Sequence, residues 1–247
     1  DTEAQTAMPV LLLARGDKDA RELLKRAIEA RYGHRPPAFD TLRIDFNGRA
    51  NTKIGPLSTW VPVELTTQFL LPNAMRWDFV AKPVGVPLRR GTESYDGKVL
   101  RSLRGTGKPD VISEQERVDS ARRRLWAIAA LLLTPLGDHF VELSTVDDLV
   151  FKAKNTQIDT DVEIHLKPNF WIDFVTVTCL NPDNNRVEQL KITAQQKLIE
   201  KDDLLLPEKI TMLWNDKPSV ELEPQEARNN PEIPMTVFTL NAGAATE

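Results

Sequence analysis

Three histidines and one cysteine are the residues with which this chain could bind a transition metal or perform nucleophilic catalysis. His34, His139 and His165 are far apart in the sequence, share no spacing typical of metal ligands, and cannot complete a zinc site with a single cysteine. Cys179 lies in an expected apolar strand without a basic neighbour in sequence that would stabilise a thiolate. We therefore expect solvated histidines, a buried structural thiol and no metal or other cofactor.

Other signatures of catalysis are also absent from the sequence. Residues 104–109 combine glycine with lysine, but they lack the phosphate-binding loop motif and carry proline where serine or threonine would bind magnesium. The acidic pairs Asp147-Asp148 and Asp202-Asp203 are typical of turns and helix N-caps. We expect no enzymatic activity. The alternative of a hydrolase acting on envelope polymers stays open, because a fold can bring together carboxylates that are distant in sequence.

The composition is that of an ordinary globular chain of 247 residues, 41% hydrophobic and 28% charged. A net charge of −4, with both signs dispersed, gives no electrostatic basis for binding nucleic acid. The longest apolar run, residues 125–133, is much shorter than the roughly 20 residues that span a bilayer. Because the sequence begins at Asp1 without methionine, we expect that an export signal, with or without a lipobox cysteine, has been removed.

A first helix is predicted over residues 18–32, after a potential N-cap at Asp17 and before a terminating Gly33. Its core-facing positions recur at intervals of three and four residues, as on one face of a helix. They are Ala20, Leu23, Leu24, Ala27, Ile28 and Arg31.

A second helix is predicted to start at Ser113, which forms a capping box with Glu116, and to run to about Leu133. Pro135 prevents it from continuing further. Its second half is apolar on all sides, so protein or ligand must surround it.

Alternating polar and apolar residues predict antiparallel strands over most of the remaining chain. In the first half they fall at residues 42–46, 61–69 and 75–81, and Asp96-Gly97 is a two-residue hairpin signal between 92–95 and 98–103. After Gly137 the expected strands are 139–143, 149–155, 162–166, 170–180, 186–193, 209–215, 220–227 and 235–240. Asparagine-rich segments at 181–185 and 215–216 are the expected turns.

These elements predict a mostly β protein of the α+β class, a long antiparallel meander that the second helix interrupts. No internal repeat or linker divides the chain. We expect one domain over residues 17–240, with flexible ends at 1–16 and 241–247.

Several short motifs, in their order along the chain, resemble those of the LolA/LolB-type periplasmic lipoprotein carriers. The resemblance covers about residues 17–240. The motifs are the helix end KRAIEARYG (25–33), the strand entry LPNAMRW (71–77), the hairpin YDGKV (95–99), the helix end LLTPL (132–136), and the late segments LPEKI (206–210) and NPEIP (230–234).

This resemblance implies an incomplete antiparallel β-barrel of about eleven strands, with helices that cover the concave face and line an apolar cavity for acyl chains. The second helix fits this arrangement, or it plugs the barrel if no ligand enters. The candidate cavity-lining residues are Leu65, Phe69, Trp77, Phe79, Leu125, Trp126, Ala129, Leu132, Phe174, Met212 and Trp214. Ordinary core packing is an alternative role for most of the aromatic residues. No arginine matches the one associated with cargo handling in the known carriers.

We therefore expect a non-catalytic, monomeric protein of the cell envelope that binds a lipid or the acyl chain of a lipoprotein. It would be periplasmic, or anchored as a lipoprotein facing the periplasm. The alternative is a structural module that contacts other envelope proteins and fills its cavity with its own side chains. The volume and lining of the cavity distinguish the two.

Overall fold

The computed structural model describes residues 12–240, apart from 55, 86–87, 195–196 and 202–203. Its helices are α1 (Lys18–Tyr32), α2 (Gln115–Leu131), the short 3-10 helix η1 (Thr134–Gly137) and α3 (Thr236–Thr239). Its strands are β1 (Arg15–Gly16), β2 (Thr41–Ile54), β3 (Leu57–Leu70), β4 (Ala74–Ala81), β5 (Arg89–Tyr95), β6 (Leu100–Arg104), β7 (Asp110–Ile112), β8 (Val141–Asp147), β9 (Val150–Asn155), β10 (Thr160–Leu166), β11 (Ile172–Asn181), β12 (Arg186–Ala194), β13 (Leu198–Lys201), β14 (Leu204–Pro207), β15 (Ile210–Trp214) and β16 (Lys217–Asn229).

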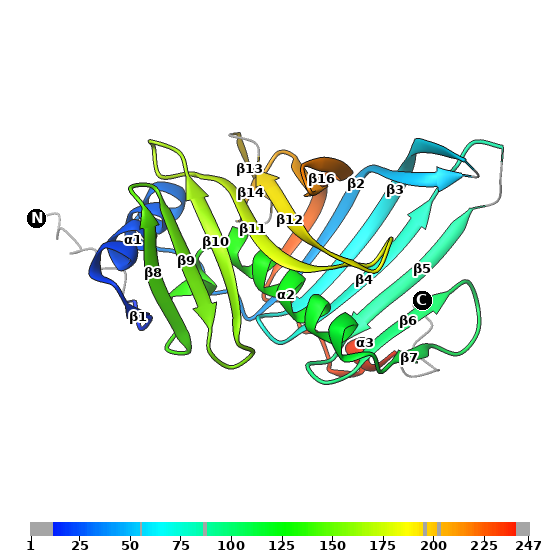
Figure 1. The fold of residues 1–247 in the computed structure, drawn as a ribbon, viewed down its shortest axis with the longest axis horizontal. Coiled ribbons are helices and arrows are strands. Elements are labelled where there is room, and N and C mark those ends of the chain that lie inside the picture. The colour runs from blue at the N-terminus through cyan, green and yellow to red at the C-terminus, as the bar shows by residue number, and fades with distance from the viewer. Residues whose placement is uncertain (1–11, 55, 86–87, 195–196, 202–203, 241–247) are drawn as a thin grey trace, which may run out of the picture.

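One large, open sheet dominates the fold, in the order β1-β8-β9-β10-β11-β12-β15-β16-β2-β3-β4-β5-β6-β7. Its neighbours pair antiparallel except β1 and β8, which pair parallel. Figure 1 shows helix α2 lying across this sheet, with α1 beside β8 at one end. The prediction of a mostly β, incompletely closed architecture is thus confirmed.

The described residues form sixteen strands, so the expected number of about eleven was wrong. Much of the difference comes from β1, β7, β13 and β14, which have between 2 and 4 residues each. Such short strands contain too few positions to show a period of two. The β13–β14 hairpin, a separate two-stranded sheet, was missed for this reason.

Helix α2 begins at Gln115, with Glu114 as an N-cap residue that makes no side-chain capping bond. The predicted capping box at Ser113 was therefore wrong. Glu114 has extended backbone angles (φ −65°, ψ 114°), which leave Ser113 outside the first helical turn. The helix ends at Leu131 rather than Leu133, because Leu133 adopts a positive φ of 65° before the proline-containing turn η1.

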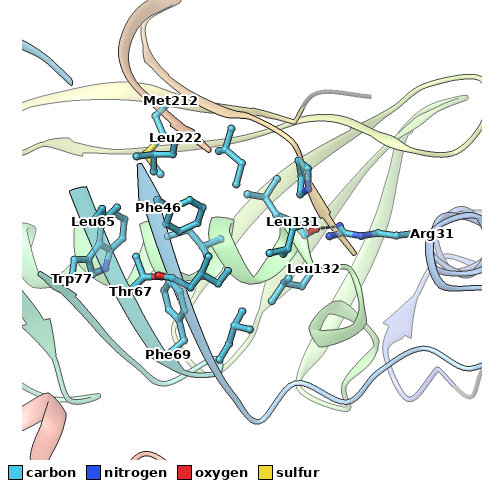
Figure 2. Close-up of a pocket in the computed structure, with 16 residues that line it drawn as sticks. Arg31, Phe46, Leu65, Thr67, Phe69, Trp77, Leu131, Leu132, Met212 and Leu222 are labelled. Atoms are coloured by element: carbon cyan, nitrogen blue, oxygen red, sulfur yellow. Dashed lines mark hydrogen bonds between the residues drawn. The ribbon is translucent and has the colours of Figure 1, made fainter. Parts of the chain in front are cut away.

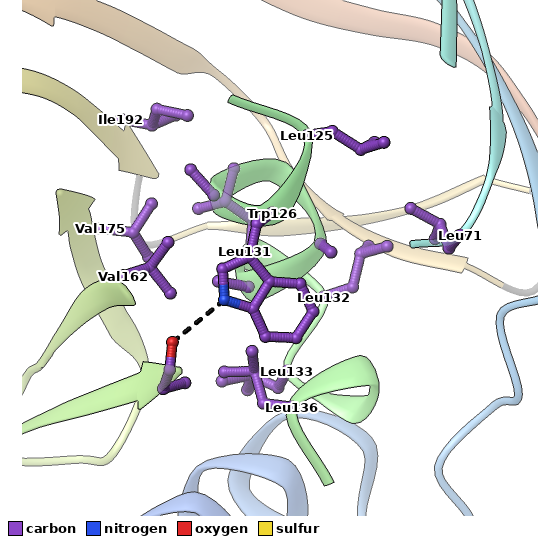
Figure 3. Packing of buried hydrophobic residues seen from close by; sticks show 14 of the residues in the cluster. Leu71, Leu125, Trp126, Leu131, Leu132, Leu133, Leu136, Val162, Val175 and Ile192 are labelled. Carbon is purple, nitrogen blue, oxygen red and sulfur yellow. Dashed lines mark hydrogen bonds between the residues drawn. The ribbon is translucent and has the colours of Figure 1, made fainter. Parts of the chain in front are cut away.

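The C-terminal half of α2 is enclosed by protein, as its apolar surface requires. Trp126 is fully buried, and its indole N–H donates to the Ala153 carbonyl of β9 at 3.0 Å. Figure 3 shows this bond on the side of the helix that faces β9 and β10, with Leu133 and Leu136 nearby. This helix is thus anchored to the sheet through Trp126.

Residues 13–16, which were expected to be flexible, make backbone contacts with the rest of the fold. The backbone N–H groups of Leu13 and Ala14 both donate to the Gly137 carbonyl, and β1 follows along β8. Asp17 is the N-cap residue of α1, but its carboxylate accepts a bond from the Thr145 N–H at 3.0 Å and does not cap the helix. The expected flexible segments 1–11 and 241–247 lie outside the described residues.

The last predicted strand, 235–240, is instead the short helix α3. Pro231 and Pro234 precede it, and proline interrupts a strand ladder because it has no N–H donor. Ser94 donates a 2.6 Å hydrogen bond to the carbonyl of Phe238, whose side chain is fully buried, and α3 contacts β4 and β5. The segment therefore folds back onto the sheet without adding a strand to it.

The other predicted strands are present, with ends shifted by at most four residues except in β2, which continues eight residues beyond its predicted end at 46. The hairpin at Asp96-Gly97 is confirmed, but its loop spans four residues because Tyr95 pairs with Leu100. The Asp96 carboxylate accepts bonds from the N–H groups of two residues in this loop. The expected turns at 181–185 and 215–216 join β11 to β12 and β15 to β16.

Candidate functional site

An apolar cavity lies between the concave face of the sheet, the C-terminal end of α2 and strand β14 (Figure 2). The centre of a water-sized sphere can occupy about 60 Å³ inside this cavity. On the same scale one water molecule needs about 10–15 Å³, so the cavity is larger than a single water site. Empty cavities with apolar walls bind apolar guests. Its lining residues are Arg31, Leu42, Ile44, Phe46, Leu65, Thr67, Phe69, Trp77, Ile128, Leu131, Leu132, Leu206, Pro207, Ile210, Met212 and Leu222.

The long strands β2, β3 and β4 form one wall of the cavity, because alternate residues of a strand face the same side. The register places these residues opposite one another in rows. The pairs on this face are Leu42 with Phe69, Ile44 with Thr67, Phe46 with Leu65, and Thr67 with Trp77. Elements far away in the sequence complete the enclosure: the last turns of α2, and strands β14, β15 and β16.

Only three of the lining side chains carry nitrogen or oxygen. Thr67 donates to the Ile44 carbonyl at 3.0 Å, so its hydroxyl hydrogen is used within the sheet. The indole nitrogen of Trp77 is buried without a hydrogen-bond partner among the described residues. A buried donor without a partner is costly, so this N–H is a place where a ligand acceptor would be favourable.

Arg31 is the third polar residue of the cavity and its one charged group. It projects from α1 and is 8% exposed. One terminal nitrogen donates to the Leu131 carbonyl and the other to the Leu205 carbonyl at 2.6 Å, while Nε has no partner among the described residues. Burial lowers the pKa of Arg31, and the neighbouring Tyr32 opposes this shift.

Arg31 thereby connects three elements around the cavity: α1, the C-terminal end of α2, and the β13–β14 hairpin. The phenol of Tyr32 supports the same junction by donating to the Leu132 carbonyl at 2.9 Å. Burial raises the pKa of Tyr32, so the phenol keeps its proton for this bond.

Five of the eleven residues that the sequence predicted as cavity-lining come together here. They are Leu65, Phe69, Trp77, Leu132 and Met212. Their role in ligand binding stays a prediction, but the structure places all of them around one space.

The other six predicted residues lie outside this lining. Phe79 is 40% exposed and its ring covers Gly91, while Phe174 stacks on His165 with ring centroids 4.1 Å apart. Leu125, Trp126 and Ala129 are buried on other sides of α2, and Trp214 packs at the margin of the core. A helix that is apolar on all sides does not reveal in its sequence which side faces a cavity.

The residues first considered for catalysis do not form a cluster. Among the described residues, no three histidine, cysteine, aspartate or glutamate side chains are placed to hold a metal ion. His34 and His139 are exposed, whereas His165 is half-buried, with Nε2 2.6 Å from a carboxylate oxygen of Glu163. Cys179 is 1% exposed, as predicted, and burial raises the pKa of its thiol.

Of the two acidic pairs, Asp147-Asp148 lies at the turn between β8 and β9, as predicted. Asp202-Asp203 lies outside the described residues. None of the helices in the described part of the chain is both long enough and apolar enough to cross a bilayer.

Eleven of the sixteen lining residues were not predicted from the sequence, and Arg31 is the charged one among them. The signal was present, because Arg31 occupies the apolar stripe of its helix together with Ala27 and Ile28. A charged residue on a core-facing stripe indicates either a partner in the core or a functional position.

No protein-family model and no curated protein matches this sequence. Its fold does resemble solved structures. A LolA superfamily protein from Nitrosomonas europaea has a TM-score of 0.51 at 13% identity, over 89% of this chain and 96% of that chain. A DUF1329 family protein from Desulfovibrio piger has a TM-score of 0.50 at 9% identity, over 90% and 98% of the two chains. A putative outer membrane lipoprotein-sorting protein domain from Vibrio parahaemolyticus has a TM-score of 0.48 at 11% identity, over 89% and 97%. The likeness to the LolA superfamily protein shows that this chain has a LolA-like fold, which the order of its sequence motifs predicted.

Proposed function

We propose that this protein is a non-catalytic protein of the cell envelope that binds an acyl chain in the cavity between the concave sheet and α2. The observation that carries the proposal is the lining of that cavity, which is apolar except for Thr67, Trp77 and Arg31. The LolA-like fold supports it by analogy. We place the protein in the periplasm or on a membrane facing it, as a monomer, with a lipid or an acylated protein as its partner.

Affinity in such a site comes from removing methylene groups from water, which contributes about 0.8 kcal/mol for each group. The space in this structure holds only a short stretch of chain, so a long chain requires the cavity to widen. Displacement of the β13–β14 hairpin, with loss of the Arg31 bond to the Leu205 carbonyl, is one way to widen it. The hairpin covers one side through Leu206 and Pro207, and it forms its own sheet, so its displacement breaks no strand pairing of the large sheet.

The small volume also supports a second candidate function, a structural or interaction module of the envelope whose core is filled by its own side chains. In that case the space beside Trp77 and Arg31 is a packing defect and no acyl chain enters it. A direct measurement of acyl-chain binding distinguishes the two functions.

A neutral fluorescent probe, N-phenyl-1-naphthylamine, tests the proposal with the purified protein. We expect saturable binding, displaced by hexadecanol, and lipid that co-purifies and is detected by native mass spectrometry. The variant Leu222→Trp fills the cavity from β16 and should weaken binding at least tenfold. Glu223→Trp is the matched control, because the next residue of the same strand is exposed and should bind as the wild type does.

Thermal unfolding of both variants verifies that they are folded before binding is compared. A wild-type protein that binds neither probe nor hexadecanol, and carries no lipid, would contradict the acyl-binding function and support the structural module. Equal loss of binding in both tryptophan variants would place the ligand outside this cavity.

A further inference from the structure

Arg31 lies at the boundary between two cavities. It lines the main apolar cavity, and it also lines a smaller neighbouring one, together with Leu133, Trp171 and Leu198. Pro207 of β14 is shared by both cavities. In Figure 2 the guanidinium enters the site from α1, on the side opposite to Trp77, with Leu131 and Leu132 between them.

The hydrogen bonds of Arg31 leave part of its guanidinium free. Its two terminal nitrogens donate to the carbonyls of Leu131 and Leu205, and Nε–H has no partner among the described residues. A guanidinium carries five N–H donors, so each terminal nitrogen also retains a second hydrogen. One edge of the group, formed by Nε–H and one of these hydrogens, is therefore available to an acceptor.

The charge of Arg31 has no acidic partner in the described part of the chain. Both hydrogen-bond acceptors are neutral carbonyls, and no carboxylate contributes to its electrostatic environment. Leu131 is the last residue of α2, so the negative end of the helix dipole offsets part of the buried charge. The Tyr32 ring, whose centroid lies 5.0 Å from Cζ of Arg31, is a further uncharged partner. A buried cation without an anionic partner remains costly, and an anion would stabilise it further.

We propose, on the premise of the acyl-binding function above, that the ligand is a single-chain amphiphile with a carboxylate head that pairs with the free edge of Arg31. The chain of this ligand occupies the apolar cavity and points toward Trp77. A carboxylate fits because its two oxygens match the planar fork of a guanidinium and accept two parallel hydrogen bonds. It also fits because it is compact, and the hollow beyond Arg31 has a volume of only about 20 Å³.

The head group is tested first with the wild-type protein, by displacement of the neutral probe with three ligands that share one chain length. They are palmitate, methyl palmitate and hexadecyl phosphate, each used below its critical micelle concentration. Charge-assisted hydrogen bonds to a guanidinium predict that palmitate binds about tenfold or more tightly than its methyl ester. Tighter binding of the phosphate than of the carboxylate would overturn the assignment of the head group.

Substitution of Arg31 then tests whether this residue causes the preference. Arg31→Gln removes the charge but keeps an amide donor for the neighbouring carbonyls, and it should abolish the preference for palmitate over the ester. Arg31→Lys retains the charge and should retain part of the preference. Arg26→Gln is the control on the same helix, where the side chain is exposed, and it should behave as the wild type.

These results separate the two proposals. If the probe and all three ligands fail to bind, the acyl-binding function itself is wrong. If they bind but palmitate and its ester bind equally, or if Arg31→Gln keeps the preference, the cavity binds chains and the role of Arg31 is wrong. Should Arg31→Gln not fold, the ligand comparison with the wild-type protein decides alone.

Discussion

Replacing Trp126 by phenylalanine should destabilise the fold without affecting ligand binding. The indole is fully buried, donates to the Ala153 carbonyl at 3.0 Å, and lies 6.1 Å from the Phe140 ring between centroids. It does not line the apolar cavity. The substitution therefore removes an anchor between α2 and β9 and leaves the walls of the cavity intact.

The magnitude follows from three losses. The hydrogen bond contributes about 1 kcal/mol. The removed ring atoms leave a space of about 40 Å³, which costs roughly 1 kcal/mol, and the lost transfer of these atoms from water adds about 1 kcal/mol more. We expect Trp126→Phe to lower the free energy of unfolding by about 3 kcal/mol, which corresponds to a decrease in Tm of about 6–12 °C for a domain of this size.

The assay is thermal unfolding followed by near-ultraviolet circular dichroism, together with probe binding at a temperature where both proteins are folded. Trp60→Phe is the control, because Trp60 is only partly buried and contacts Arg49 on the surface through its ring. A Tm of Trp126→Phe within 2 °C of the wild type would refute the anchoring role of this indole. Weakened probe binding in the folded variant would show that Trp126 faces the ligand.

Three further predictions concern other parts of the chain. Hydrogen bonds from Arg49 and Lys209 lower the pKa of Glu221 from 4.5 to about 2, so the stabilisation by this carboxylate is complete above pH 4.5 and is lost as the pH falls toward 2. Glu221→Gln should lower Tm by about 2–4 °C at pH 7, and the difference in Tm from the wild type should disappear in acid. A Tm difference that does not depend on pH would contradict the ion pair. Because burial raises the pKa of the Cys179 thiol, a disulfide reagent at pH 8 should not react within minutes with the native protein but should label it after unfolding; rapid labelling of the native state would show that the thiol is accessible. Phe238→Ala should release α3 from the sheet and lower the free energy of unfolding by about 3 kcal/mol. The release should be detected as faster proteolysis near residues 230–240. Met235 is 47% exposed, so the control variant Met235→Ala should be cleaved as slowly as the wild type.

Most of the fold could be predicted because its strands are long and amphipathic. In β2 and β3 the buried apolar residues alternate with more exposed ones, and this alternation is visible in the sequence alone; they are Leu42, Ile44, Phe46, Val61, Leu65 and Phe69. Strands β13 and β14 have 4 residues each and escape such a pattern. The segment 235–240 alternates like a strand but becomes α3, since the two prolines that precede it and its docking onto β4 and β5 override the local preference.

The candidate site could be predicted only in outline. The sequence indicated that residues of α2 and of the early strands lie near one apolar space, and Leu65, Phe69 and Leu132 do line it. It could not show which side of α2 faces that space. Trp126 looked equivalent to Leu132 in the sequence, but the rotation of the helix on the sheet places it against Ala153.

Local periodicity and residue type are enough to predict a mostly β chain and a helix that must be enclosed, and to show that the sequence carries no recognised catalytic motif. Where the apolar surfaces meet, and which polar groups remain among them, depends on the packing of elements that are distant in sequence. Arg31 on α1 reaches carbonyls of Leu131 and Leu205, which are 100 and 174 residues away along the chain. Whether a buried charge has a partner depends on which distant elements the fold brings to it, and local sequence patterns do not contain that information.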